Sequence, residues 1–145
     1  MNSEMKKFGI QYSIFIFTIF TAIFIYYNQF QSIDLYLALS ILFGQALWSL
    51  GSYLNTHFFL ITGHICYLLL VILIPLLSNN KPLLIYTLFL IGINLIFRAC
   101  NDNVCMLNMF DFDYVPDIPN KSFLYLFIIM ASIILYKLFI PYFNS

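Results

Sequence analysis

Long apolar runs separated by short polar stretches make up most of this chain. Five runs are each about 17–20 residues long, close to the ~20 residues that a helix needs to cross the hydrocarbon layer of a membrane. Lipid offers the backbone no hydrogen-bond partner, and a helix satisfies its backbone groups internally. We therefore expect an all-α, polytopic membrane helix bundle that forms a single domain over residues 1–145. The expected transmembrane helices cover about residues 8–27, 35–54, 58–77, 83–99 and 123–140.

The polar stretches define the boundaries of these helices. Asn28–Asp34 separates the first pair, and Ser78–Pro82 has the composition of a turn. Asn55–His57 is very short, so residues 35–77 could instead include a re-entrant or tilted segment, and four spans are the alternative. The one long connection covers about residues 100–122. Its mixture of apolar residues and carboxylates predicts a loop that lies along the membrane interface.

The basic residues give an expected orientation. Lys6 and Lys7 precede the first apolar run, which is longer than the ~7–15-residue core of a signal peptide, so we expect a retained helix. Short cytoplasmic loops carry an excess of Lys and Arg. An N-terminus on the inner side places Arg98 and Lys121 there too, with Lys81 and the helix-end Lys137 outside. The sequence therefore favours this orientation.

The composition narrows the classes of function that this chain could have. Hydrophobic residues make up 63% of the chain and charged residues 8%, and the mean hydropathy is +0.94. A soluble domain has about 25% charged residues, so the bilayer is the expected solvent. The formal net charge is zero, and no basic patch is available for nucleic acid. No predicted helix has a central Asp or Glu of the kind that proton-driven transporters use. We find no catalytic constellation, and we expect neither enzymatic activity nor a cofactor.

The stretch IFRACNDNVC, residues 96–105, interrupts the apolar pattern. Arg98 falls at a predicted helix end, where its side chain could reach the headgroups or contact a substrate or partner. Asn94 precedes Arg98 by four residues and shares its helix face. Cys100 and Cys105 could be plain thiols, a structural disulfide or a redox pair. The CxxC spacing typical of thiol redox enzymes is absent.

The interfacial loop contains further candidate contacts. Phe110 and Tyr114 are its candidate partner-facing or lipid-facing side chains. Asp111 and Asp113 form a D-x-D pair that could bind a divalent cation through oxygen ligands. A single D-x-D is a weak motif without a glycine-rich phosphate loop, so we expect no metal site.

The second predicted helix has a candidate close-packing face. Ser40 and Gly44 form a small-xxx-small pair, a pattern that lets membrane helices approach closely. Gln45 could form a hydrogen bond across that contact, and Trp48 lies one turn further along the helix. The partner could be another helix of this chain or a different protein.

The remaining polar groups give no further motif. His57 and His64 are seven residues apart and share a helix face, but no other predicted helix supplies a histidine for haem. We expect His57 at the interface and His64 hydrogen-bonded. The other polar residues in the spans are scattered, one or two per helix: Thr18, Thr21, Thr62, Thr87 and Ser132.

Residue usage suggests a source. Phe (17) and Tyr (11) are abundant, whereas Gly and Pro number five each. The favoured residues have A/T-rich codons. In this respect the chain resembles hydrophobic subunits encoded by protist mitochondrial genomes, and equally membrane proteins of large AT-rich DNA viruses.

Three hypotheses follow. The first is a non-catalytic structural or accessory subunit of a larger membrane complex, in particular a respiratory-chain complex of the mitochondrial inner membrane, with lipid and other subunits as partners. The second is a small transporter or channel subunit with a path lined by Gln45, His64, Asn94 and Arg98. The third is a membrane enzyme that uses Asp111, Asp113 and the two cysteines of residues 100–105.

Overall fold

The structure is a computed structural model that describes residues 3–100 and 120–143, and all regular secondary structure in these ranges is α-helical. This confirms the all-α prediction. Each of the five predicted segments lies within one helix. The helices are α1 (Ser3–Asn28), α2 (Ser32–Leu54), α3 (His57–Leu77), α4 (Lys81–Cys100) and α5 (Asn120–Phe143).

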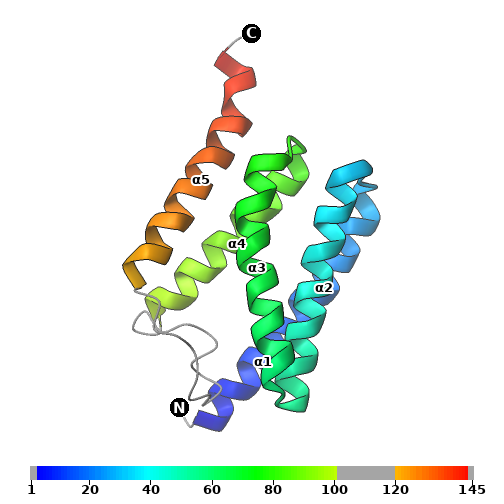
Figure 1. Ribbon diagram of the computed structural model, residues 1–145, viewed down its shortest axis with the longest axis vertical. Helices are drawn as coiled ribbons and strands as arrows, with labels where there is room; N and C mark the ends of the chain where they lie inside the picture. Colours follow the sequence, from blue (N-terminus) through cyan, green and yellow to red (C-terminus); the bar gives the residue numbers. More distant parts are fainter. Residues whose placement is uncertain (1–2, 101–119, 144–145) are drawn as a thin grey trace.

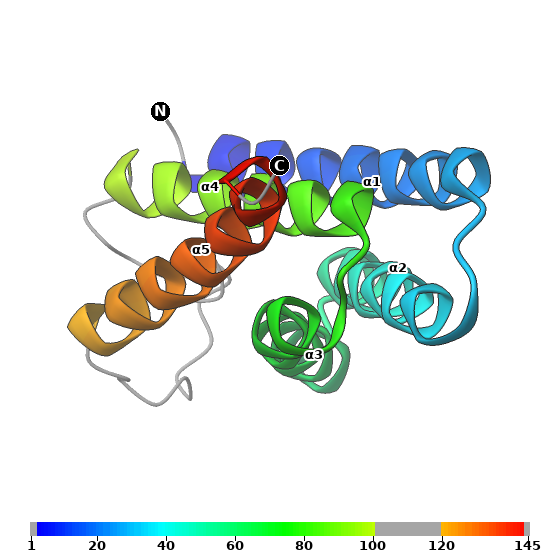
Figure 2. The same cartoon turned by 90° about the horizontal axis from the view of Figure 1, so that it is seen from above.

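Successive helices run in alternating directions along a common long axis (Figure 1). Seen from above, α1 and α4 form one layer, and α2 and α3 form a second layer beside it (Figure 2). The α5 helix packs against α4 and α3 and leans away from α1 and α2 (Figure 1). The four helices α1–α4 therefore enclose a common interior, which α5 covers from one side.

Three helices are long and apolar enough to cross a membrane: α1 over Gln11–Asn28, α2 over Ser32–Leu54 and α3 over His57–Leu77. The apolar stretches found in α4 and α5, Lys81–Ile96 and Leu124–Ile140, are shorter. These findings support a membrane protein.

The link between α2 and α3 is a two-residue turn. Asn55 caps α2 in the left-handed conformation, with φ 52° and ψ 43°. Asparagine tolerates this conformation better than most residues. The Thr56 N–H donates to the Gly51 carbonyl oxygen at 2.9 Å. The predicted tight hairpin is therefore present, and α3 begins at His57 as a continuous helix of 21 residues.

This turn directs α3 back along α2, and glycines set the spacing between the two helices. A Cβ atom on Gly63 would lie 2.7 Å from the Gly44 carbonyl oxygen and 3.0 Å from the Trp48 backbone nitrogen. A Cβ on Gly51 would lie 2.7 Å from the Leu60 nitrogen. These neighbours are backbone atoms, which cannot move aside as a flexible side chain can. The two backbones are therefore closer here than any side chain would permit.

The opposite end of the molecule is held together by polar groups around Ser78, in the turn between α3 and α4. The Ser78 hydroxyl donates to Asp34 Oδ1 at the start of α2, at 2.6 Å. Lys137 Nζ of α5 donates to the Ser78 carbonyl oxygen at 2.8 Å. The Asn80 side chain caps α4 by accepting the Leu83 N–H at 3.1 Å. The positive Lys137 is also favourable at the C-terminal end of α3, where the helix dipole is negative.

We expect the Gly63→Ala variant to unfold more easily than the parent chain. The added methyl group would push α2 and α3 apart, and overpacking of this kind costs about 1–3 kcal/mol. The higher helix propensity of alanine offsets at most ~1 kcal/mol of this cost. Denaturation in mixed micelles by increasing SDS, followed by circular dichroism, measures the change. Gly92→Ala is the matched control, because a Cβ atom added to Gly92 would meet nothing within 4 Å. Equal stability of the two variants would contradict the close contact.

Candidate functional site

The structure places the predicted close-packing residues of α2 in different environments. Gly44, Gln45 and Trp48 are buried, and Ser40 is exposed. A Cβ on Gly44 would lie 3.1 Å from Cys66 Cβ of α3. Of the two alternatives that the sequence left open, the contact at Gly44 is therefore with another helix of this chain.

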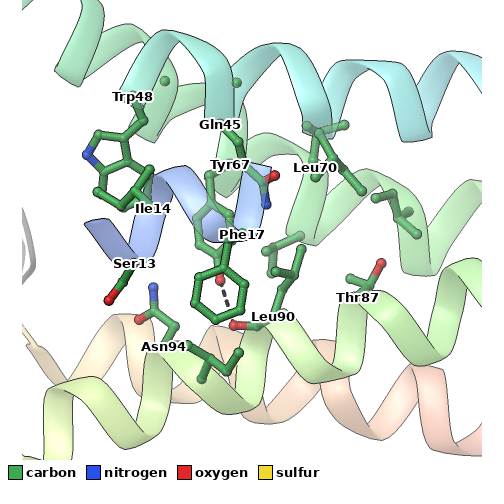
Figure 3. A pocket seen from close by; sticks show the side chains of 16 residues that line it. Ser13, Ile14, Phe17, Gln45, Trp48, Tyr67, Leu70, Thr87, Leu90 and Asn94 are labelled. Carbon is green, nitrogen blue, oxygen red and sulfur yellow. Dashed lines mark hydrogen bonds between the residues drawn. The ribbon is translucent and has the colours of Figure 1, made fainter. Parts of the chain in front are cut away.

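Gly44, Gln45 and Trp48 also line a cavity of about 90 Å³ between α1, α2, α3 and α4, which we call the four-helix cavity (Figure 3). Asn94 of α4 lines the same cavity. Gln45, Trp48 and Asn94, three polar residues that the sequence singled out, thus share one interior space. The complete lining is Ser13, Ile14, Phe17, Ile41, Gly44, Gln45, Trp48, Gly63, Tyr67, Leu70, Val71, Ile74, Thr87, Leu90, Ile93 and Asn94.

Trp48 forms part of the wall through its indole ring. The ring centroid lies 5.7 Å from that of His64, edge to face, and 6.4 Å from that of Tyr67. The side chain is only 8% exposed. Within the described part of the chain, no acceptor reaches the buried Trp48 Nε1. A buried donor without a partner costs about 1–3 kcal/mol, so this N–H is available to a molecule that brings an acceptor.

Gln45 reaches from the cavity wall into a buried polar cluster. Its Oε1 lies 2.5 Å from the Thr21 hydroxyl of α1, which also forms a hydrogen bond with the Tyr86 hydroxyl of α4. The Phe17 carbonyl oxygen is 2.8 Å from the same threonine oxygen. Threonine has one hydroxyl proton, so Thr21 donates to one of the two carbonyl oxygens and accepts the proton of Tyr86. The cluster joins three helices.

Aromatic rings reinforce this junction between α1 and α4. The Tyr86 ring stacks on Phe24, with centroids 4.4 Å apart and planes 19° apart, and a second, more distant partner is Phe20 at 6.3 Å. Phe17 and Phe89 form the next pair along the same seam, at 6.3 Å. Aromatic pairs of this kind contribute about 0.5–1.5 kcal/mol beyond the area that they bury.

The prediction that polar groups are scattered among the helices is wrong for α1 and α2. Besides Thr21 and Gln45, Thr18 and Ser49 form a hydrogen bond at 3.1 Å, and Gln11 Nε2 donates to the Ser52 carbonyl oxygen at 2.6 Å. The paired residue numbers decrease on α2 as they increase on α1, as two antiparallel helices require. The other polar residues of the spans form hydrogen bonds within their own helices. The hydroxyls of Thr62, Thr87 and Ser132 each donate to a backbone carbonyl oxygen of the same helix.

Other candidate residues contribute less. His57 begins α3 and His64 packs on Trp48. Within residues 3–100 and 120–143, no three His, Cys, Asp or Glu side chains gather in a possible metal site. Arg98 and Cys100 belong to the last turn of α4, but their side chains lie outside the described residues. Cys105, Phe110, Asp111, Asp113 and Tyr114 also lie outside them.

A second hollow lies on the outer side of the bundle, between α1 and α2, and we call it the outer groove. Its volume is about 490 Å³. Its lining includes the exposed rings of Tyr12, Phe15 and Tyr53 and the small residues Ala46 and Ser49. The remaining lining residues are Gln11, Thr18, Leu50 and Ser52. The sequence analysis missed this groove, because it depends on how α1 crosses α2.

We expect Tyr86→Phe to lower the stability of the bundle, because Thr21 and Gln45 lose a buried hydrogen-bond partner. Hydrogen bonds between membrane helices contribute about 0.6 kcal/mol on average and ~1.7 kcal/mol at most. The measurement is SDS denaturation in micelles. Tyr36→Phe serves as the control, because Tyr36 is 72% exposed. In a double-mutant cycle, the loss of stability in Tyr86→Phe/Thr21→Val should be smaller than the sum of the losses in the two single variants. A double-variant loss equal to that sum would contradict the hydrogen-bonded cluster.

Comparison with protein-family models, with curated proteins and with solved structures finds no match to this chain. Its functional interpretation therefore depends on its own residues and geometry.

Proposed function

We propose that this chain is a non-catalytic, integral-membrane subunit of a larger membrane assembly. The observation that supports the proposal best is the outer groove between α1 and α2. The small residues Ala46 and Ser49 in its lining would let another helix approach closely, and tight packing is a main source of attraction between helices in lipid. The exposed rings of Tyr12, Phe15 and Tyr53, which also line the groove, would pack against such a helix.

The hydroxyl groups of Thr18, Ser49 and Ser52, which line the outer groove, already have partners. Thr18 and Ser49 bond to each other, and the Ser52 hydroxyl donates to the Ser49 carbonyl oxygen at 2.9 Å. An apolar helix could therefore cover the groove without leaving these hydroxyls unsatisfied. This favours a protein partner over a water-filled path at this surface.

The proposal includes a membrane crossing by all five helices. At 1.5 Å per residue, the 20 residues of α4 and the 24 of α5 extend about 30 and 36 Å, enough for the hydrocarbon layer. Exposed tyrosines also lie near the two ends of the bundle, where membrane proteins concentrate them. They are Tyr12, Tyr53 and Tyr125, in the first half of α1, at the end of α2 and at the start of α5, and Tyr26, Tyr27, Tyr36 and Tyr136, at the end of α1, near the start of α2 and in the second half of α5.

Residue usage supports a more specific setting, a respiratory-chain complex of a mitochondrial inner membrane encoded by an AT-rich genome. The same usage fits a viral membrane or another cellular membrane. Purification of the assembly distinguishes these sources, because the co-purifying proteins identify it.

Side-specific labelling tests the five crossings. In a chain with its three cysteines replaced by serine, we expect Asn79→Cys and Ser122→Cys to react with a membrane-impermeant maleimide from opposite sides. A tag appended after residue 145 should be accessible from the side of Asn79. The expected orientation places Ser122 on the inner side with the N-terminus. Reaction of both cysteines from one side would show that α4 does not cross.

Native gel separation after mild-detergent extraction tests the subunit proposal. We expect the chain to migrate in a complex of several proteins that mass spectrometry can identify. Ala46→Phe should fill the outer groove and shift most of the chain out of that complex. Ala22→Phe is the matched control, since Ala22 is an exposed alanine of α1 that does not line the groove.

Migration of the parent chain at monomer size would contradict the subunit proposal. It would favour the alternative of a small transporter or channel subunit, with a path through Gln45, His64, Asn94 and Arg98. Two of these four residues, Gln45 and Asn94, line the four-helix cavity. Flux assays in liposomes would then be the next measurement.

A further inference from the structure

The four-helix cavity has few hydrogen-bonding groups left for a guest. The Tyr67 hydroxyl donates to the Leu90 carbonyl oxygen at 3.2 Å, and Thr87 donates to the Leu83 carbonyl oxygen at 2.8 Å. Ser13 donates to the Gly9 carbonyl oxygen at 2.8 Å. Gln45 is engaged with Thr21. The main remaining groups among the described residues are the Trp48 N–H and the amide of Asn94.

These remaining groups lie at one end of the cavity. Figure 3 shows the Trp48 indole, Ser13 and Asn94 together toward one end, with Leu70 and Thr87 toward the other. Apart from Thr87, whose hydroxyl is already bonded, the far end has apolar walls, which include Leu70, Val71 and Ile74. A guest with one polar end and one apolar end matches this arrangement.

The polar end of the cavity includes a residue at the surface of the bundle, because Ser13 lines the cavity and is exposed as well. The ring contacts between described residues of α1 and α4 lie further along the helices, at Phe17–Phe89 and beyond. A chain in the surrounding lipid could therefore enter beside Ser13 without separating the stacked rings.

The size of the cavity limits the guest. An apolar cavity of about 150 Å³ binds benzene, whereas this one measures about 90 Å³. It is therefore smaller than a cavity that takes a ring and suits a slender chain. Water molecules would also fit, but a buried water needs two to four polar partners. The apolar end offers none that is not already bonded.

We propose that the four-helix cavity binds the carbonyl-end segment of a single alkyl chain of a lipid or fatty acid. The apolar part lies against Leu70, Val71 and Ile74. The carbonyl or carboxyl oxygen lies near Ser13, where it accepts a hydrogen bond from Trp48 Nε1 or from the Asn94 amide. The inference goes beyond the proposed role as a subunit and does not depend on it.

Trp48 allows a direct test, because it is the only tryptophan in the chain. The full chain is reconstituted in vesicles of dioleoyl phosphatidylcholine and in vesicles of the same lipid brominated in the middle of its chains. Bromine quenches indole fluorescence at short range. We expect the emission of Trp48 to be quenched in the brominated vesicles although the residue is only 8% exposed.

Filling the cavity should remove this quenching. Val71 is 2% exposed and lines the cavity, so Val71→Phe would occupy the space of the chain. Leu76→Phe is the matched control on the same helix, since Leu76 is exposed and does not line the cavity. If Val71→Phe fails to fold, as judged by elution volume and circular dichroism, Thr87→Leu on α4 fills the same space from another wall.

A lipid-facing tryptophan measures the quenching that comes from the surrounding bilayer. The double variant Trp48→Phe/Phe43→Trp provides it, because Phe43 is exposed on α2. Its quenching should not respond to Val71→Phe. The proposal would be overturned if Trp48 is not quenched, or if Val71→Phe and Thr87→Leu leave its quenching unchanged. Either result would favour a cavity that holds only water.

A second arm identifies the source of the chain. A mid-chain-brominated fatty acid is added to the protein in unbrominated vesicles. Saturable quenching at low mole fraction would support binding of a free fatty acid. If the added fatty acid does not quench, and quenching in the first experiment rises with the mole fraction of brominated phospholipid, the result would support entry of a membrane lipid chain.

Discussion

The close approach of α2 and α3 is the contact on which the rest of the structure depends. Lipid tails are as apolar as the side chains, so no hydrophobic effect draws helices together inside the bilayer. Helices associate there through tight packing and hydrogen bonds. Gly51 and Gly63 permit a backbone distance that no larger residue would allow. The contact also fixes the rotation of α2 about its axis, and so decides which of its residues face inward.

That rotation explains the two polar features of the interior. With Gly44 against α3, Gln45 points toward α1 and α4, where Thr21 and Tyr86 meet it. Trp48, one turn further along, covers Gly63 and forms part of the cavity wall. The same face of α1 that supplies Thr21 also supplies Gln11 and Thr18 to α2. The hydrogen bonds between helices therefore follow from one packing arrangement.

The four-helix cavity and the outer groove lie on different sides of the α1–α2 pair and suit different partners. The four-helix cavity is small, largely apolar and lined by four helices, which fits a slender chain. The outer groove is larger, and its lining includes exposed rings and hydroxyl groups that are already bonded. It fits a helix. A subunit that contacts both protein and lipid in these two ways would be anchored in its assembly as well as in its membrane.

The sequence by itself determined the number, order and approximate limits of the helices, because long apolar runs and short polar interruptions are local properties of the chain. It also marked Gly44, Gln45 and Trp48 as unusual residues on α2, and left open whether their partner lay within the chain. Only the tertiary structure decided that they face inward. It also revealed Gly63, which has large aromatic residues and no small one four positions away on either side. Thr21 and Tyr86 are 65 residues apart in the sequence, and no periodicity relates residues on different helices. Such pairs, and the four-helix cavity, depend on the rotation and crossing of whole helices, which are fixed by contacts between distant segments.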